Sequence, residues 1–296
     1  MRISFRHVAL ALGLGVAGTT ACSRAPRVAD RDGGTSHVPG VTDPDGGTSH
    51  VPSVTDPDGG AGVPGLRGKV RWQWQLSGVL DIAIDADVFD LDLFDVPQEA
   101  IDSLRANGRY VICYFSAGSR EAWRPDVASL PAEAVGEPLS GWPDEHWLDV
   151  RHPAVRALAV ARLERAQARG CHAVEPDNVD AYQNSSGFPL TDSDQLAFNR
   201  FLAAQAHARG LAIALKNDVE QVAALEPDFD FALNEECLAF SECEMLSPFI
   251  VAGKAVLHVE YAKSAQAPVL CGAATTEGFS TLLKNPSLDA WRYACP

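Results

Sequence analysis

The sequence has few basic residues for its length. Its 296 residues include 24 Lys and Arg against 39 Asp and Glu, which gives a formal net charge of -15 at pH 7. Nucleic acids and anionic membrane surfaces attract proteins through Lys and Arg, so this balance argues against both as partners. The acidic excess favours a neutral or cationic ligand instead.

The N-terminal apolar run is too short to span a membrane as a helix, which needs about 20 apolar residues. It extends from Val8 to Ala17, follows Arg2 and Arg6, and leads into small residues that end at Cys22. This order is typical of a secretory signal, so we predict that residues 1–22 are a signal peptide and that the protein is exported. Residues 19–22 also resemble a bacterial lipobox, without its usual Leu. We therefore expect either a secreted protein or a cell-envelope lipoprotein, attached to the membrane only through a lipid on Cys22.

Residues 23–65 lack the side chains that build a core. They are rich in Gly, Pro and Asp, and a repeat unit starts at Asp32, at Asp45 and, in decayed form, at Asp58. This composition predicts a disordered linker. His37 and His50 recur only because the unit recurs, and we do not expect them to bind metal.

Zinc-type motifs are also missing, since the sequence has no Cys-x-x-Cys pair and no cluster of Cys and His. After Cys22 an even number of cysteines remains, which fits disulfides in an exported protein. Two pairs follow from position in the sequence: Cys237 with Cys243, and Cys271 with Cys295. Cys113 and Cys171 lie in apolar strands, where a disulfide and buried free thiols are equally natural.

Residues 66–296 alternate between strand-like and helix-like segments, which predicts a parallel sheet. Strands are expected at 72–76, 88–92, 110–115, 147–149, 172–177, 211–216, 230–235, 255–260 and 290–293. Helices are expected at 97–107, 153–169 and 193–209, each ending before a Gly. The size and pattern fit a single catalytic domain with an α/β fold, a (β/α)8 TIM-type barrel. The strands are one too many for such a barrel, so one short strand should be irregular.

Acidic residues gather where these strands end, which is where barrel enzymes place their active sites. They stand in the segments 90–92, 147–149, 175–180, 234–236 and at Glu260. Such acids bind a metal, work as a carboxylate pair on a glycosidic bond, or recognise a cation; strand-end acids also cap helices. A metal-dependent hydrolase built on Asp90, Asp92, Asp149 and Asp177 lacks the His ligands of catalytic zinc sites, with only His258 near a strand end. We therefore expect no metal.

Aromatic residues near the same strand ends favour sugar chemistry, because the C–H faces of sugar rings stack on planar side chains. A single Trp is more often part of the core, but the cluster is harder to explain that way. Its members are Trp72, Trp74, Phe89, Tyr114, Trp123, Trp142, Trp147 and Tyr182.

Several longer strings resemble glycoside hydrolase family 114, the endo-α-1,4-polygalactosaminidases. They occur in the family's order between Trp72 and Tyr261: Trp74-Gln75-Leu76, Asp90-Leu91-Asp92, the segments 111–118 and 175–180, Trp142-Pro143, Leu215-Lys216-Asn217 and the segment 234–237. The resemblance implies a (β/α)8-type barrel that hydrolyses α-1,4-linked galactosamine or N-acetylgalactosamine polymers without a cofactor. The expected partner is thus an amino-sugar polysaccharide, and we expect a monomer.

The resemblance also implies the catalytic pair, which falls on Asp177 and Glu235. We assign Asp177 as nucleophile and Glu235 as general acid/base. Glu236 is the neighbour that could be confused with Glu235; strand alternation puts the two on opposite faces but does not say which face lines the barrel. Our candidates for holding the sugar are Trp74, Asp92, Tyr114, Asp149, Asn178, Lys216, Glu236 and Glu260.

A second hypothesis keeps the barrel but not the turnover: a carbohydrate-binding surface lipoprotein without catalysis. It stays open at this point because a fold does not prove an activity. The presence of both Asp177 and Glu235 favours an enzyme.

Overall fold

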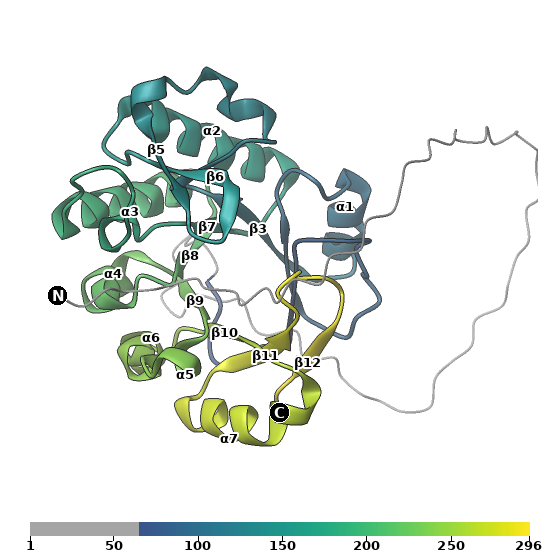
Figure 1. Ribbon diagram of the computed structural model, residues 1–296. Coiled ribbons are helices and arrows are strands. Elements are labelled where there is room, and N and C mark those ends of the chain that lie inside the picture. Colours follow the sequence, from purple (N-terminus) through teal and green to yellow (C-terminus); the bar gives the residue numbers. More distant parts are fainter. Residues whose placement is uncertain (1–64) are drawn as a thin grey trace, which may run out of the picture. The chain divides into compact units, whose positions relative to one another are not determined.

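A barrel of parallel strands forms the centre of the computed structural model, which describes residues 65–296 (Figure 1). The predicted signal peptide, Cys22 and residues 23–64 of the predicted linker lie outside the described residues. Eight strands pair in parallel in one continuous order. They are β1 (Trp72–Gln75), β2 (Val88–Asp92), β3 (Tyr110–Ser116), β7 (Ala173–Asp177), β8 (Ala212–Lys216), β9 (Phe231–Glu235), β10 (Val256–Tyr261) and β11 (Ser280–Lys284). The predicted TIM-type barrel is confirmed.

Helices surround the barrel (Figure 1), and each of the three predicted helices is present. The predicted helices are α1 (Gln98–Ala106), α2 (Pro153–Arg169) and α3 (Asp192–His207). Four more helices follow them in the chain: α4 (Val222–Leu225), α5 (Cys237–Phe240), α6 (Ser247–Val251) and α7 (Ala267–Glu277). Gly108, Gly170 and Gly210 follow the first three with φ of 70°, 77° and 69°. Glycine adopts this left-handed conformation without steric cost, so these residues end the helices where the sequence indicates. No helix in residues 65–296 is both long and apolar enough to cross a membrane.

Two strand predictions need correction. Trp147–Asp149 is not a barrel strand, because residues 147 and 148 end β6 (Trp142–Leu148). This strand lies in a separate antiparallel sheet with β4 (Ser119–Glu121) and β5 (Val135–Leu139), inserted between β3 and α2. The true eighth barrel strand, β11, was missed. The strand expected at 290–293 is β12 (Arg292–Ala294), which runs antiparallel to β11.

The strands β11 and β1 do not pair directly with each other, and the C-terminal segment closes the barrel between them. The backbone N–H groups of Leu76 and Ser77 donate to the Leu288 carbonyl oxygen, at 3.0 and 3.2 Å. The buried Lys284 at the end of β11 donates to the carbonyl oxygens of Asp289 and Trp291, at 2.6 and 2.7 Å. Burial lowers the pKa of this lysine to about 8. Residues 285–294 therefore fill the seam that an ordinary strand ladder would close.

Two apolar clusters follow from strand alternation. The inner cluster comes from strand residues that point into the barrel, including Trp72, Ile112, Leu233 and Leu257. The outer cluster joins the opposite strand faces to the helices. The barrel is thus filled by side chains below the strand ends, and only its upper rim is left for a pocket.

All three cysteine pairs form disulfides: Cys113–Cys171, Cys237–Cys243 and Cys271–Cys295. Of the two alternatives for Cys113 and Cys171, the disulfide is the one present. It links β3 to the start of β7 across 58 residues, whereas Cys237–Cys243 spans only 6. The Cys113–Cys171 disulfide should therefore reduce the entropy of the unfolded chain more than Cys237–Cys243 does.

We expect Cys113→Ala/Cys171→Ala to lower the free energy of unfolding by about 4 kcal/mol, because a long loop loses most entropy when it is closed in the unfolded chain. Cys237→Ala/Cys243→Ala is the matched control and should cost about 2 kcal/mol by the same reasoning. Urea unfolding monitored by circular dichroism measures both. An equal loss in the two variants would contradict the loop-entropy explanation.

Candidate active site

A pocket of about 600 Å³ opens where the barrel strands end, between the barrel and the inserted sheet. It lies at the C-terminal rim, where TIM barrels place their active sites. Barrel side chains form its floor: Trp74, Asp92, Tyr114, Asp177, Lys216, Glu235 and Tyr261. The insertion supplies its wall: Glu121, Trp123, Arg124, Trp142, Glu145 and Trp147.

Lys216 lies at the centre of the floor, with its side chain 1% exposed. Its Nζ is 2.6 Å from Glu175 Oε1, 3.4 Å from Asp177 Oδ2 and 3.3 Å from Glu235 Oε2. Burial lowers the pKa of this lysine, but the three carboxylates outweigh burial and raise the pKa well above its usual range. Lys216 is therefore an ammonium ion. Since both oxygens contact one nitrogen, those of Asp177 and Glu235 lie at most about 6.7 Å apart, the sum of the two distances.

Tyrosine hydroxyls contact both carboxylates of this pair. Tyr114 donates to Asp177 Oδ2 at 3.3 Å, and Tyr261 donates to Glu235 Oε1. Burial, followed by the charge of the neighbouring carboxylate, raises the pKa of each tyrosine, so both stay protonated donors. Asn217 holds the backbone of Glu235 through its Oδ1, which accepts from the Glu235 N–H at 2.9 Å. Each carboxylate is thus held in a fixed position.

The choice between Glu235 and Glu236 depends on which face of β9 lines the barrel. Phe231 and Leu233 belong to the inner cluster, so Glu235 continues that face into the pocket. Glu236 has φ of 61°, and its N–H donates to the Val259 carbonyl oxygen at 2.7 Å. This left-handed turn leads into α5, and Glu236 does not line the pocket.

The other candidates for holding the sugar fall into two groups, those that line the pocket and those that do not. Trp74, Asp92, Tyr114, Asn178 and Lys216 line the pocket. Asp149 and Glu260 do not. Asp149 pairs with Arg151 at 2.8 Å and accepts the Arg151 N–H, which stabilises the turn before α2. Glu260 is on the outer face of β10, where it accepts from the Leu238 N–H and contacts His258.

A second pair of acids, absent from our candidates for catalysis and sugar binding, lies beneath Lys216. Both Asp90 and Glu175 are fully buried. Neither oxygen of Asp90 accepts a hydrogen bond from the described residues. Burial and the charge of Glu175 raise the pKa of Asp90 well above its usual range. The raised pKa favours the neutral form of Asp90 beside Glu175, whose carboxylate accepts from Trp74 Nε1 at 3.1 Å.

We expect Asp90→Asn to keep stability within about 1 kcal/mol, because the amide has the shape of a protonated carboxyl and can donate to Glu175. Glu175→Gln should be far more harmful, since it leaves the buried Lys216 without its nearest counter-charge. Thermal unfolding and hydrolysis rates of the two variants, compared side by side, test this. Equal damage from both changes would mean that Asp90 is ionised.

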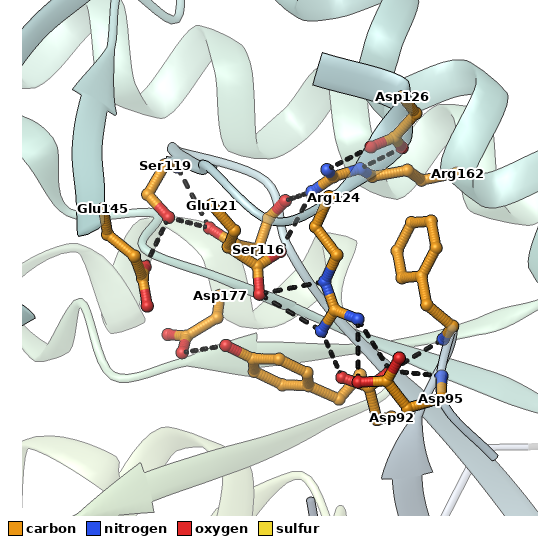
Figure 2. A network of polar contacts seen from close by, with 12 residues as sticks. Asp92, Asp95, Ser116, Ser119, Glu121, Arg124, Asp126, Glu145, Arg162 and Asp177 are labelled. Carbon is orange, nitrogen blue, oxygen red and sulfur yellow. Dashed lines mark hydrogen bonds and ion pairs between the residues drawn. The ribbon is translucent and has the colours of Figure 1, made fainter. Parts of the chain in front are cut away.

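Buried ion pairs attach the inserted sheet to the barrel (Figure 2). Arg124 contacts Asp92 and lies 3.1 Å from Asp95 and 3.2 Å from Glu121. Arg162 from α2 pairs with Asp126 at 2.9 Å. Asp92 is thus occupied by Arg124, although it lines the pocket. The sequence does not indicate the ion pairs of Glu121, Arg124 and Asp126, because these residues do not stand at the end of a barrel strand.

The four aspartates of the metal hypothesis do not form one site. Asp90 faces Glu175, Asp92 pairs with Arg124, and Asp149 pairs with Arg151. Within residues 65–296, one group of three potential ligands lies close together: Cys237, Cys243 and His258. Its two sulfur atoms form a disulfide, so they are not thiolate ligands.

Comparisons with known proteins agree with this geometry. Residues 57–296 match the family model of glycoside hydrolase family GH114. A crystal structure of Aspergillus fumigatus Ega3 in complex with galactosamine is 37% identical with a TM-score of 0.74, covering 79% of this chain and 97% of that one. The glycoside hydrolase domain of PelA from Pseudomonas aeruginosa shares the fold at 16% identity, with a TM-score of 0.62 over 77% of this chain and 98% of that one. An uncharacterised protein of Deinococcus radiodurans is 27% identical over 231 residues, covering 67% of this chain and 74% of that one.

Proposed function

This chain belongs to glycoside hydrolase family 114, and from that premise we propose that it hydrolyses α-1,4-linked galactosamine polysaccharides with two carboxylates. The observation that carries this proposal is the position of Asp177 and Glu235, both in contact with one ammonium group on the pocket floor. The upper limit of about 6.7 Å on the distance between their oxygens leaves room for a retaining pair, about 5–5.5 Å apart, and excludes most of the inverting range, roughly 6.5–9.5 Å.

The substrate class follows from the pocket's charge and from a relative. Its described lining has six acids, Asp92, Asp95, Glu121, Glu145, Asp177 and Glu235, against the cations Arg124 and Lys216. Such a pocket favours a ligand with protonated amino groups over a neutral or anionic sugar. Ega3, 37% identical to this chain, was crystallised with galactosamine. Trp123 and Trp142 line the same pocket and are about half exposed, so they offer faces on which sugar rings can stack.

In the mechanism that we propose, Asp177 attacks the anomeric carbon while Glu235 gives its proton to the departing glycosidic oxygen. The bond to the leaving sugar breaks and a covalent glycosyl ester forms on Asp177. Glu235 then takes a proton from water, whose oxygen attacks the same carbon and releases Asp177. The net result is hydrolysis with retention of the anomeric configuration. Lys216 supports the negative charge of Asp177 before attack and after release.

The test is to incubate the purified protein with a partially deacetylated α-1,4-linked galactosamine polymer and to measure reducing ends and product size. We expect new reducing ends together with a rapid fall in polymer length. An α-1,4-linked galacturonan, which is anionic, is the matched control and should remain intact. Tight binding of the amino-sugar polymer without new reducing ends would instead support a non-catalytic binding protein.

We also propose that the protein is exported and acts as a monomer. Three disulfides support export, because they persist mainly in oxidising compartments. Fractionation of cells that express the full chain should find it in the envelope or the medium. If Cys22 carries a lipid, Cys22→Ser should move the protein from the membrane fraction to the soluble one. Presence of the intact chain in the cytoplasm would contradict export.

A further inference from the structure

Glu145 is a buried acid in the pocket wall that has no role in the mechanism above. It lies on β6, where it is 8% exposed, and its register partner on β4 is Glu121, which is 2% exposed. Like charges directly opposite each other on antiparallel strands repel. Two buried carboxylates in this arrangement therefore need compensating charge.

Among the described residues, the arginines form ion pairs with Glu121 and not with Glu145. Arg124 lies 3.2 Å from its Oε1 and Arg162 lies 3.6 Å from its Oε2. Within residues 65–296, Glu145 has no ion pair, and its one hydrogen bond comes from the Ser119 hydroxyl at 2.8 Å. The other oxygen of Glu145 is left without a donor in a wall that faces the pocket (Figure 2).

The surroundings of Glu145 favour a cation next to it. Burial is the main cause that raises the pKa of Glu145 to about 7, and the negative charges of Glu121 and Asp177 add to it, whereas the hydrogen bond from Ser119 and the charge of Arg124 lower it. A carboxyl group with this pKa stands near its titration point at neutral pH. A cationic group arriving in the pocket would favour the ionised form and would supply the missing charge.

A short chain of hydrogen bonds links Glu145 to the catalytic pair. Ser119 donates to Glu145 and lies 3.3 Å from Asn178 Nδ2. Asn178 follows Asp177 directly, and its backbone N–H donates to Asp177 Oδ1 at 2.7 Å. Ser119 therefore holds the Glu145 side chain in the same pocket that Asp177, our proposed nucleophile, also lines.

We propose that Glu145 binds the ammonium group of a galactosamine unit in the pocket and thereby selects deacetylated over N-acetylated sugar. This inference rests on the proposed function, because it concerns the same pocket and the same class of polymer. An N-acetyl group has no positive charge, so it leaves Glu145 uncompensated. A charge-assisted hydrogen bond of this kind should favour the free amine by about 10- to 100-fold in Kd.

The test measures binding rather than turnover. The probes are α-1,4-linked trimers of galactosamine and of N-acetylgalactosamine, titrated calorimetrically into the Glu235→Gln protein so that hydrolysis does not interfere. We expect the galactosamine trimer to bind about 10- to 100-fold more tightly. Adding Glu145→Gln, which keeps the side chain's size and its contact with Ser119, should remove most of that preference.

Asp144→Asn is the matched control, since Asp144 is the exposed neighbour on β6 and loses the same charge outside the pocket. It should leave the preference unchanged. The inference is overturned if both trimers bind equally before Glu145 is changed, a result that does not depend on how Glu145→Gln folds. It is also overturned if Glu145→Gln weakens both trimers by the same factor. The proposed function fails separately, if the unmutated protein cuts no galactosamine polymer.

Discussion

Asp177→Asn and Glu235→Gln should each lower kcat on a galactosamine polymer by at least about 10³-fold, because in the mechanism that we propose each removes a group that takes part in bond breaking. Both changes keep the size of the side chain, and Tyr114 and Tyr261 can still donate to the remaining carbonyl oxygen. Stability should therefore change little. Reducing-end assays with a thermal unfolding curve for each variant measure the two effects separately.

Glu236→Gln is the matched control for Glu235→Gln, since the neighbouring carboxylate lies outside the pocket. Its activity should stay within a few-fold of the original. The roles within the pair can be separated with azide. A glycosyl azide of inverted configuration is expected from Asp177→Gly, and one of retained configuration from Glu235→Gly. Full activity in both single variants would contradict the two-carboxylate mechanism.

Lys216→Met should have the next largest effect, about 10²-fold or more on kcat/KM, with a loss of about 3–5 kcal/mol in unfolding free energy. The change leaves the buried carboxylate of Glu175 without its ion pair at 2.6 Å. Burial raises the pKa of Glu175 and Lys216 lowers it, so removing the lysine must raise that pKa further. Glu175 then ionises only at higher pH, so the acidic limb of the pH–activity curve should shift upward.

Lys284→Met is the matched control, because Lys284 is equally buried and also stands at the end of a barrel strand, β11. It contacts backbone carbonyls rather than the acidic pair, so it should lower stability without moving the acidic limb. Initial rates between pH 4 and pH 9 in about half-unit steps would reveal the shift. An unmoved acidic limb in Lys216→Met would show that Lys216 does not stabilise the ionised form of Glu175.

Much of the fold could be predicted because the barrel repeats one pattern. Helices ending at Gly170 and Gly210 and followed by apolar strands fix the βα alternation. The prediction of strands from this βα pattern is wrong where the chain departs from the alternation. The sequence pattern does not reveal β11 (Ser280–Lys284), which is as long as β2 and β8, because the helix before it, α7, has no clear apolar stripe in its sequence. Residues 147–149 look like a barrel strand locally, and only pairing with β4 and β5 shows otherwise.

The residues of the candidate site that stand at barrel strand ends could be predicted from the sequence. Those that come from the inserted sheet could not. The motifs indicate Asp177 and Glu235, but only the inner face of β9 distinguishes Glu235 from Glu236. Glu145 gave no signal because it stands inside a strand of the inserted sheet. Its importance comes from Glu121 opposite it and from the arginines that leave it uncompensated, which are contacts between distant parts of the sequence.

The C-terminal seam also governs when the barrel can be completed. Chains are synthesised from the N-terminus, and residues 285–294 are made after every parallel strand. Until then the free edges of β1 and β11 face each other without partners, and such edges pair readily with those of other molecules. A product that ends before Leu288 should therefore aggregate instead of folding into a barrel with one missing loop. Synthesis of this last stretch thus determines whether the barrel closes or leaves two strand edges open to other molecules.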